Sequence, residues 1–118
     1  MPDRVLIVDD HVGFRGAARQ LLQGMGCQVV GEAGTGAEAL SEARRLKPDL
    51  VLLDIQLPDL DGFKVAASLS SEPEPPVVVL VSSRDAAAYG PRLAAVGALG
   101  FIAKADLSAE SLMALLEA

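Results

Sequence analysis

The chain has 118 residues, which is enough for one domain with its own core and too few for two. Its formal net charge of −6 excludes a basic face that binds nucleic acid directly, and no apolar stretch approaches the roughly 20 residues of a membrane span. Cys27 is the single cysteine, which excludes an internal disulfide, and we expect no signal peptide because only four residues precede Val5. We therefore expect a cytoplasmic protein in which Cys27 fills the core.

Five short aliphatic runs follow one another along the chain, at residues 4–8, 28–33, 50–54, 77–81 and 98–103. Runs of this length are typical of strands that are buried on both faces of a parallel sheet. Helical patterns separate the runs, so strand and helix alternate five times. This alternation predicts an α/β domain with right-handed crossovers and helices on both faces of the sheet.

The segment after the first run has apolar residues at the i, i+3, i+4 spacing of a helix that packs on a sheet. These residues are Phe14, Ala17, Ala18, Leu21, Leu22 and Met25. The second helix is predicted to start at the T-x-x-E capping box of Thr35 and Glu38. Its apolar face consists of Leu40, Ala43 and Leu46.

Two further helices are predicted later in the chain. One follows Asp61, and its inward residues are Val65, Ala66 and Leu69. The last begins at Ser108 as N-cap, and its buried residues are Leu112, Leu115 and Leu116. The proline-rich stretch from Glu72 to Pro76 is expected to be a loop that leads into the fourth strand, because proline cannot serve a central ladder.

The region where a further helix is due, residues 84–96, contains Gly90 followed by Pro91. Proline inside a helix removes one backbone hydrogen bond and clashes with the preceding turn, and it is accepted only in the first turn. We therefore predict a short turn at residues 85–88, a break near Gly90 and an ordered helix that starts at about Pro91 and ends before Gly97. Ser82–Tyr89 would then form a loose loop.

Three aspartates stand at the ends of two apolar runs. Asp9 and Asp10 follow the first run and Asp54 ends the third, so their side chains are expected to meet at the carboxyl edge of a parallel sheet. Three carboxylates in one place repel one another unless a cation joins them, and this set suits a small hard cation such as Mg²⁺. The alternative is that Asp9 and Asp10 only cap the helix that begins near His11, a residue that is expected to be solvated.

Two more polar residues are expected at the same edge. Ser82 directly follows the fourth run, with Ser83 as the alternative hydroxyl, and Lys104 follows the fifth, with an ordinary surface lysine as the alternative. When a cation is bound, one carboxylate can attack a phosphoryl group and form an acyl phosphate. The cation, the lysine and the hydroxyl then share the phosphoryl oxygens.

From Val5 to Leu116 the chain resembles the receiver domain of two-component response regulators. The resemblance rests on the Asp9–Asp10 pair, the Asp54–Gly62 stretch of the form D-x-x-x-P-x-x-x-G, the hydroxyl of Ser82 and Lys104. Within that family, the phrases DHVGFR, GEA and GFIAK are most similar to the NarL/FixJ subfamily.

The resemblance implies a flavodoxin-like, doubly wound, five-stranded parallel sheet with strand order 2-1-3-4-5. It also implies one receiver domain over residues 1–118, which is either a single-domain regulator or a receiver whose DNA-binding output domain lies outside this chain. DNA would then be bound only through that output domain. The implied partners are a sensor histidine kinase or phosphotransfer protein, and a second copy of the chain in a homodimer.

The resemblance also implies a role for the acidic residues. Asp54 is implied to be the phosphoacceptor. Asp10 and Asp54 are implied to ligate Mg²⁺ directly together with the backbone carbonyl of Gln56, while Asp9 acts mostly through water.

The remaining site residues are implied to bind the phosphoryl group or to change conformation after phosphorylation. Ser82 is implied to bind a phosphoryl oxygen and to move inward on activation, Lys104 to pair with Asp54 and then with the phosphoryl group, and Phe101 to occupy the aromatic switch position. The surface around the fourth helix, fifth strand and fifth helix would then change its affinity for a partner. Lys104 is followed by Ala105 where receivers commonly have a cis proline, and a cis bond here costs about 3 kcal/mol, so a trans bond or a strained exception is expected.

Parts of the sequence also match the patterns of two other functions. A haloacid-dehalogenase-like phosphatase also uses an aspartate nucleophile with Mg²⁺, but it requires an acid two residues later, where this chain has Gln56. The domain is therefore expected to be a regulatory phosphoacceptor that catalyses only its own phosphorylation and dephosphorylation. Residues 34–39 match the G-x-G-x-x-A pattern of dinucleotide-binding folds, but the capping box at Thr35 explains the same residues.

Overall fold

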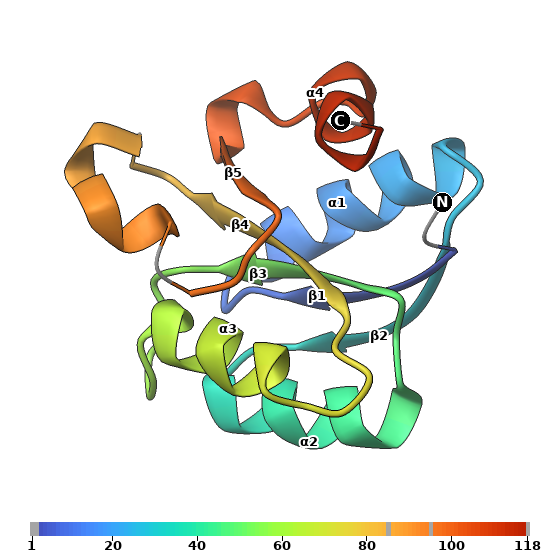
Figure 1. Cartoon of the computed structure of the whole chain (residues 1–118). Helices are drawn as coiled ribbons and strands as arrows, with labels where there is room; N and C mark the ends of the chain where they lie inside the picture. The colour runs from blue at the N-terminus through green and yellow to red at the C-terminus, as the bar shows by residue number, and fades with distance from the viewer. Residues whose placement is uncertain (1–2, 85, 95, 118) are drawn as a thin grey trace.

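The computed structural model describes residues 3–84, 86–94 and 96–117. One five-stranded parallel sheet has the order β2-β1-β3-β4-β5, which confirms the strand order implied by the resemblance. The strands are β1 Arg4–Val8, β2 Gln28–Ala33, β3 Leu50–Asp54, β4 Val77–Ser82 and β5 Gly100–Ala103. Two helices cover each face of the sheet (Figure 1). These are α1 Val12–Gly24 and α4 Ala109–Leu116 on one face, and α2 Gly36–Leu46 and α3 Gly62–Ser70 on the other.

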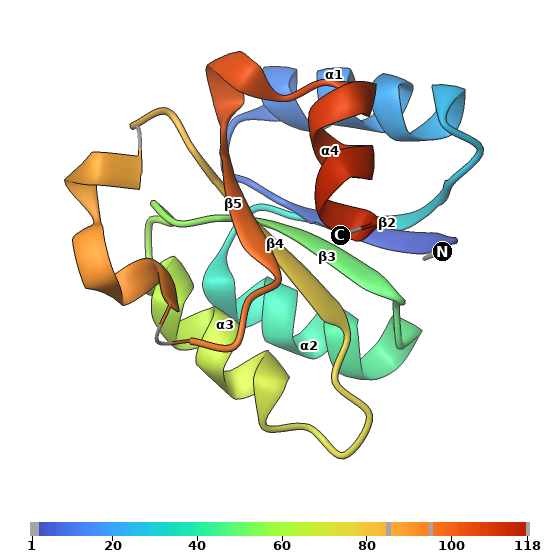
Figure 2. The same cartoon turned by 45° about the horizontal axis from the view of Figure 1, so that its top comes forward.

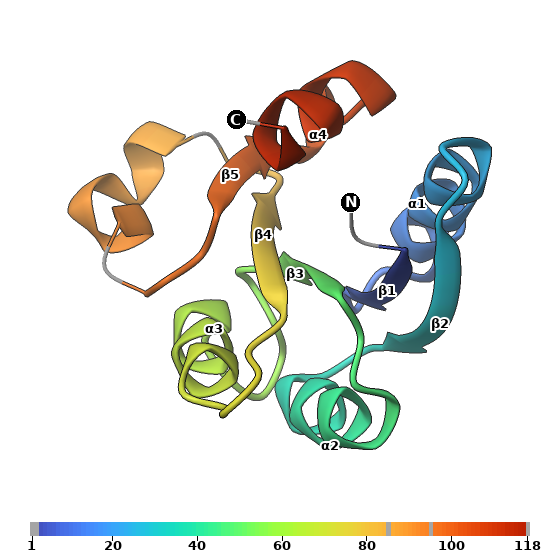
Figure 3. The ribbon, with the colours of Figure 1, turned by 45° about the vertical axis from the view of Figure 1, so that its right-hand side comes forward.

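The central strands are apolar on both sides because both of their faces are covered. Side chains alternate across a strand, so Val5 and Ile7 of β1 pack with α1 and α4, whereas Leu6 and Val8 pack with α2 and α3. All four side chains have no exposed surface. Figure 3 shows the two helix layers on opposite sides of the twisted sheet. The strand interiors are therefore fixed by the core, and polar residues are left for the strand ends.

The predicted helix starts are confirmed. Thr35 caps α2 by accepting the Glu38 N–H at 3.1 Å, and Asp61 caps α3 by accepting the Phe63 N–H at 2.8 Å. Ser108 caps α4 in a reciprocal pair with Ser111. Each capping side chain satisfies an amide that has no partner within its own helix.

The burial of one helix residue and the boundaries of two strands differ from the predictions. Ala17 of α1 is exposed, because the buried stripe of this helix is centred on Ala18 and Leu22 and is narrower than the periodicity indicated. Strand β4 extends one residue further, to Ser82, and β5 begins only at Gly100. Leu99, predicted to lie within the fifth strand, instead precedes it and is 45% exposed.

No continuous helix forms between β4 and β5 in the described part of the chain. Two short 3₁₀ helices, Ala86–Ala88 and Gly90–Ala94, take its place beside the β5 edge of the sheet (Figure 2, orange). The break predicted near Gly90 is confirmed, and Gly90 has the φ of +57° that favours glycine. We refer to residues 86–94 as the 3₁₀ segment. Asp85 lies outside the described residues.

The prediction that Ser82–Tyr89 is a loose loop is wrong at both ends. Ser82 is the last residue of β4 and is fully buried. The Tyr89 hydroxyl lies 2.5 Å from Ser82 Oγ, so a side-chain contact ties the far end of this loop to the sheet. Sequence patterns describe backbone preferences, and this contact between side chains seven residues apart was not visible in them.

Cys27 is only 7% exposed and packs in the layer formed by α1 and α4, as predicted for a core residue. Its burial, and secondarily the charge of Asp3, raise the pKa of the Cys27 thiol. Among the described residues, no helix has the length and apolar character needed to span a bilayer.

Candidate functional site

The pairing of the strands brings the predicted site residues to one edge of the sheet. Val8 of β1 pairs with Leu53 of β3, so the residues that follow them, Asp9 and Asp54, are neighbours at the carboxyl ends of the two strands. Ser82 pairs with Ala103, and Lys104 comes next in the chain. The carboxylates, the hydroxyl and the lysine therefore come from the ends of four adjacent strands and loops, as predicted.

Four side chains form an acidic cluster at this edge. One ligand atom from each of Asp9, Asp10, His11 and Asp54 lies within 4.8 Å of all the others. Asp9 and Asp54 are buried, whereas Asp10 and His11 are exposed. His11 was expected to be solvated, and its ring is 69% exposed, but its Nδ1 lies 3.0 Å from Asp9 Oδ1 and 3.1 Å from Asp10 Oδ1. His11 is thus a member of the cluster that sequence reasoning missed.

Lys104 brings one positive charge to the two buried carboxylates. Its Nζ lies 2.5 Å from Asp9 Oδ2 and 3.5 Å from Asp54 Oδ2. The same ammonium lies 4.4 Å from the centre of the Phe14 ring, a cation–π contact that holds it over α1. Lys104 is therefore a site residue rather than a surface lysine. The bond to Ala105 is trans, since the described residues contain no cis peptide bond.

The electrostatic setting makes Asp54 harder to ionise than an ordinary carboxyl. Burial and, secondarily, the charge of Asp9 raise the pKa of Asp54 to about 6. The Gln56 N–H, which donates to Asp54 Oδ1 at 3.2 Å, and the Lys104 ammonium act in the opposite direction. Asp54 is still mainly ionised at neutral pH.

The site has the properties of a place for a small cation. Asp9 Oδ2 is fully buried, and it has no hydrogen-bond donor of good geometry in the described part of the chain, although Lys104 Nζ is close. A buried carboxylate oxygen without such a donor is costly unless another positive group neutralises it. Carboxylate oxygens from several elements that converge within a few ångströms are the ligands that hard divalent cations prefer.

The loop that follows Asp54 is held in one conformation by a close backbone contact. The Gly62 N–H donates to the Ile55 carbonyl at 2.8 Å, and Gln56 pairs with Asp61 across the loop. A Cβ on Gly62 would lie 2.5 Å from the Asp54 carbonyl oxygen, so glycine is required here. This contact places Gln56 next to the Asp54 carboxylate.

Ser82, rather than Ser83, is the buried hydroxyl at this edge. Its Oγ accepts the Arg84 N–H at 3.1 Å and lies 2.5 Å from the Tyr89 hydroxyl. In the described part of the chain, it has no hydrogen bond to the acidic cluster. Phe101 is half-buried and its ring centre lies 6.0 Å from that of Tyr89. Tyr89 is a second site residue that sequence reasoning missed.

Asp59, in the loop after β3, caps helix α2. Its carboxylate accepts the N–H groups of Gly36 at 2.7 Å and Ala37 at 3.0 Å, and these two bonds lower the pKa of Asp59. The N-terminus of α2, where a dinucleotide fold binds its phosphates, is therefore occupied by a carboxylate of the same chain. The dinucleotide-binding alternative is not supported.

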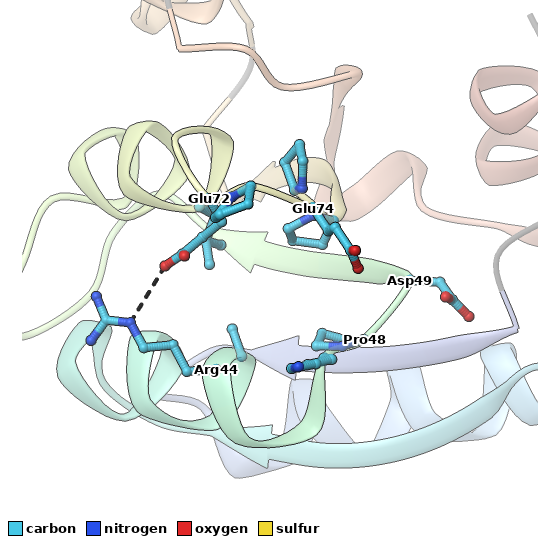
Figure 4. A pocket seen from close by; sticks show the side chains of 11 residues that line it. Arg44, Pro48, Asp49, Glu72 and Glu74 are labelled. Atoms are coloured by element: carbon cyan, nitrogen blue, oxygen red, sulfur yellow. Dashed lines mark hydrogen bonds and ion pairs between the residues drawn. The ribbon is translucent and has the colours of Figure 1, made fainter.

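A hollow of about 610 Å³ lies between the C-terminal ends of α2 and α3, next to the segments that lead into β3 and β4. Figure 4 shows its charged side chains, with Glu72 directed toward Arg44. These two form an ion pair at 3.4 Å, and the exposed fraction of Arg44 is 67%. Among the described residues, the metal-ligating groups converge at the acidic cluster and not in this hollow. The hollow is therefore not the candidate site.

A parallel α/β sheet with carboxylates, a hydroxyl and a lysine at its carboxyl edge is the arrangement expected of a receiver domain. The family described as response regulator receiver domain matches residues 5–117. The chain therefore belongs to the response regulator receiver family, and its class is the phosphorylation-activated signalling switch of two-component systems. Nothing supports the phosphatase alternative.

Relatives of known kind agree with this assignment. A protein of Pseudomonas aeruginosa named as a transcriptional regulator is 43% identical over 111 residues, which cover 94% of this chain and 54% of that protein. The response regulator GacA of Pseudomonas syringae pv. syringae is 41% identical over 115 residues, 95% of this chain and 53% of GacA. The chain thus spans about half the length of these relatives.

Solved structures show the same fold. The signal receiver domain of the response regulator NarL from Mycobacterium tuberculosis superposes with a TM-score of 0.85 at 38% sequence identity, covering 98% of this chain and 94% of that one. The response regulator domain of Thermotoga maritima CheB superposes with a TM-score of 0.86 at 28% identity, covering 100% and 96%.

Proposed function

We propose that Asp54 is the phosphoacceptor of this receiver and that Lys104 and Ser82 bind the phosphoryl group after transfer. The observation that supports this most strongly is the convergence of three aspartates within 4.8 Å, with one ammonium in contact with two of them. Of these aspartates, Asp54 is buried at the end of the central strand β3, next to β4, whose last residue is Ser82.

The transfer itself needs little from the protein beyond position and charge. A carboxylate oxygen of Asp54 forms a bond to phosphorus while the bond between phosphorus and the donor's leaving atom breaks, and the leaving group departs with that electron pair. With acetyl phosphate as donor, the products are an acyl phosphate on Asp54 and acetate. Because the pKa of Asp54 is about 6, the ionised nucleophile predominates at neutral pH. Lys104, 3.5 Å from Asp54 Oδ2, can pair with the new phosphoryl oxygens.

The acidic cluster fits Mg²⁺, which would neutralise the carboxylates and bind the incoming phosphoryl oxygens. The residues proposed to hold it are Asp10 and Asp54 through their carboxylates and Gln56 through its backbone carbonyl, with Asp9 acting through water. Asp9 Oδ2 lies 2.5 Å from Lys104 Nζ, which supports an indirect role for Asp9. The contacts of His11 with Asp9 and Asp10 would have to loosen when the cation binds.

The proposed partners follow from the family. A sensor histidine kinase or phosphotransfer protein in the cytoplasm would donate the phosphoryl group, and the modified surface would act on an output. Phe101, half-buried beside Tyr89, is proposed as the aromatic residue that changes its packing when Ser82 moves. Control of transcription by the whole protein is proposed because relatives that share this domain are named as transcriptional regulators. Another relative that shares it is a protein-glutamate methylesterase, so the domain itself does not dictate the output.

The proposal is tested by incubating the chain with acetyl phosphate and Mg²⁺ and measuring the intact mass. We expect the addition of one phosphoryl group, no addition to Asp54→Asn, and no addition in EDTA. Asp106→Asn, an exposed carboxylate that follows Lys104, is the matched control and should be labelled like the wild type. Equal labelling of Asp54→Asn and the wild type would show that Asp54 is not the acceptor.

A further inference from the structure

Tyr89 contacts the Ser82 hydroxyl, for which the described residues show no hydrogen bond to the acidic cluster. Its phenolic oxygen lies 2.5 Å from Ser82 Oγ, which also accepts the Arg84 N–H at 3.1 Å. A serine hydroxyl has one proton and two lone pairs, and the Arg84 N–H occupies one lone pair. The Tyr89 hydroxyl either accepts the Ser82 proton or occupies the second lone pair. In the described part of the chain, the hydroxyl is engaged only on the side of the 3₁₀ segment.

Tyr89 is itself fixed by rings from two other elements. Its ring centre lies 5.6 Å from that of Phe63 in α3, in an edge-to-face arrangement, and 6.0 Å from that of Phe101 in β5. Because it is seated between these rings, Tyr89 cannot follow Ser82 toward Asp54 without movement of the surrounding segment.

Arg92 adds a second tie from the same segment. Its guanidinium lies 4.3 Å from the centre of the Phe63 ring and contacts Asp61 Oδ2 at 2.5 Å. Asp61 caps α3, so the 3₁₀ segment is anchored to the start of that helix as well as to Ser82. The segment consists of two short 3₁₀ helices rather than a long α-helix, so side-chain contacts help to fix where it lies.

We infer that Ser82 donates its single proton to Tyr89, which makes Tyr89 a positioning residue that competes with the phosphoryl group for that proton. Phosphorylation then breaks the Ser82–Tyr89 hydrogen bond and loosens the 3₁₀ segment. This inference rests on the proposed function of Asp54. When Ser82 turns to bind a phosphoryl oxygen, the Tyr89 hydroxyl loses its partner, and the segment keeps its aromatic and Arg92 contacts and the packing of Leu93 on the core. Tyr89 thus links the chemical step to a surface made of residues 86–94. It also provides a hydroxyl where the aromatic residue at the switch position, Phe101, has none.

The first test removes only the phenolic oxygen. Tyr89→Phe keeps the ring between Phe63 and Phe101, so the fold should be retained, but Ser82 becomes free to turn. At a fixed concentration of acetyl phosphate with Mg²⁺, we expect Tyr89→Phe to accumulate phosphorylated protein about fivefold faster than the wild type, the effect of one neutral hydrogen bond. Labelling at the wild-type rate, or more slowly, would overturn the inference.

The second test uses the wild-type protein, in which Tyr89 is the only tyrosine and there is no tryptophan. Tyrosine emission therefore reports Tyr89 alone, and its quenching by acrylamide measures how accessible that ring is. Phosphorylation, verified by intact mass, should raise the quenching constant, whereas Asp54→Asn under the same conditions should show no change. Ser82→Ala should raise it without any phosphorylation, and Ser83→Ala, the exposed neighbouring serine, should not.

The two proposals fail in different ways. A wild-type protein that acquires no phosphoryl group at Asp54 contradicts the proposed function. A protein that is fully phosphorylated at Asp54 but keeps an unchanged acrylamide quenching constant contradicts only the role of Tyr89.

Discussion

The first three crossovers of this sheet and the fourth are built in different ways. After β1, β2 and β3 the chain forms α-helices of 13, 11 and 9 residues, whose apolar faces lie against the sheet. After β4 it forms 3₁₀ helices of 3 and 5 residues beside the sheet edge. Pro91 and Gly90 account for the difference, since neither is suited to a helix interior.

The two kinds of crossover serve different needs of the site. Asp9 and Asp54 lie at the carboxyl ends of the paired central strands β1 and β3, which are followed by regular helices, and both are buried. Ser82, the hydroxyl that has to move in the proposed mechanism, leaves the strand that leads into the irregular crossover. Regions with few buried apolar contacts open at lower free energy than a packed core. The irregular crossover is therefore where movement is least costly.

The largest expected effect concerns the energetic cost of burying the ionised Asp54 among the regular crossovers. The folded pKa of Asp54, about 6, exceeds the ordinary value of 3.8, so the stability that its protonated form provides is fully present below about pH 4 and is lost as the pH rises through 6. In EDTA, Asp54→Asn should therefore gain about 3 kcal/mol over the wild type at pH 7.5 and almost nothing at pH 3.5. Urea unfolding at both pH values measures this difference. Mg²⁺ should stabilise the wild type more than the variant. An advantage that does not change with pH would contradict the burial argument.

The next effect tests the close backbone contact in the loop after β3. A Cβ on Gly62 meets backbone atoms of Asp54 and Ile55 at 2.5 Å, so Gly62→Ala should lower the free energy of unfolding by about 2–3 kcal/mol and slow labelling of Asp54. Gly16→Ala is the matched control. Gly16 lies inside α1, where a Cβ would meet nothing within 4 Å, so this change should stabilise the protein by about 0.5–1 kcal/mol. Equal free energies of unfolding for Gly62→Ala and Gly16→Ala would show that the loop after β3 can accommodate a Cβ at residue 62.

The smallest effect concerns the irregular crossover. Arg92 is largely exposed, so the loss of its contact with Asp61 in Arg92→Ala should change global stability by less than about 1 kcal/mol. Its local effect should be larger, because the 3₁₀ segment has few other ties. Amide hydrogen exchange should become faster in residues 86–94 while α3 retains its protection. An equal increase in amide exchange in residues 86–94 and in α3 would mean that the two kinds of crossover open as one unit. It would contradict the view that the irregular crossover opens at lower free energy.

Much of this protein was determined by local sequence. The continuous apolar runs predicted the five strands, of which the three central ones are buried and the edge strands β2 and β5 are mostly half-buried. The residues Thr35, Asp61 and Ser108 predicted three helix starts, and Gly90 with Pro91 predicted a broken crossover. These features depend on backbone preferences and on periods of two and of about 3.6 residues, which neighbouring residues alone express. Parallel topology then implied that acids and a lysine at strand ends meet at one edge.

The tertiary structure decided which of those groups contact one another. The bond between Tyr89 and Ser82, the closer approach of Lys104 to Asp9 than to Asp54, and the capping of α2 by Asp59 were not visible in the sequence. Asp59 and Gly36 are 23 residues apart, and the Lys104 ammonium is directed by a ring from α1. Contacts of this kind depend on side-chain rotamers, strand register and the distance between layers. These are set only when the whole core packs, so no local pattern records them.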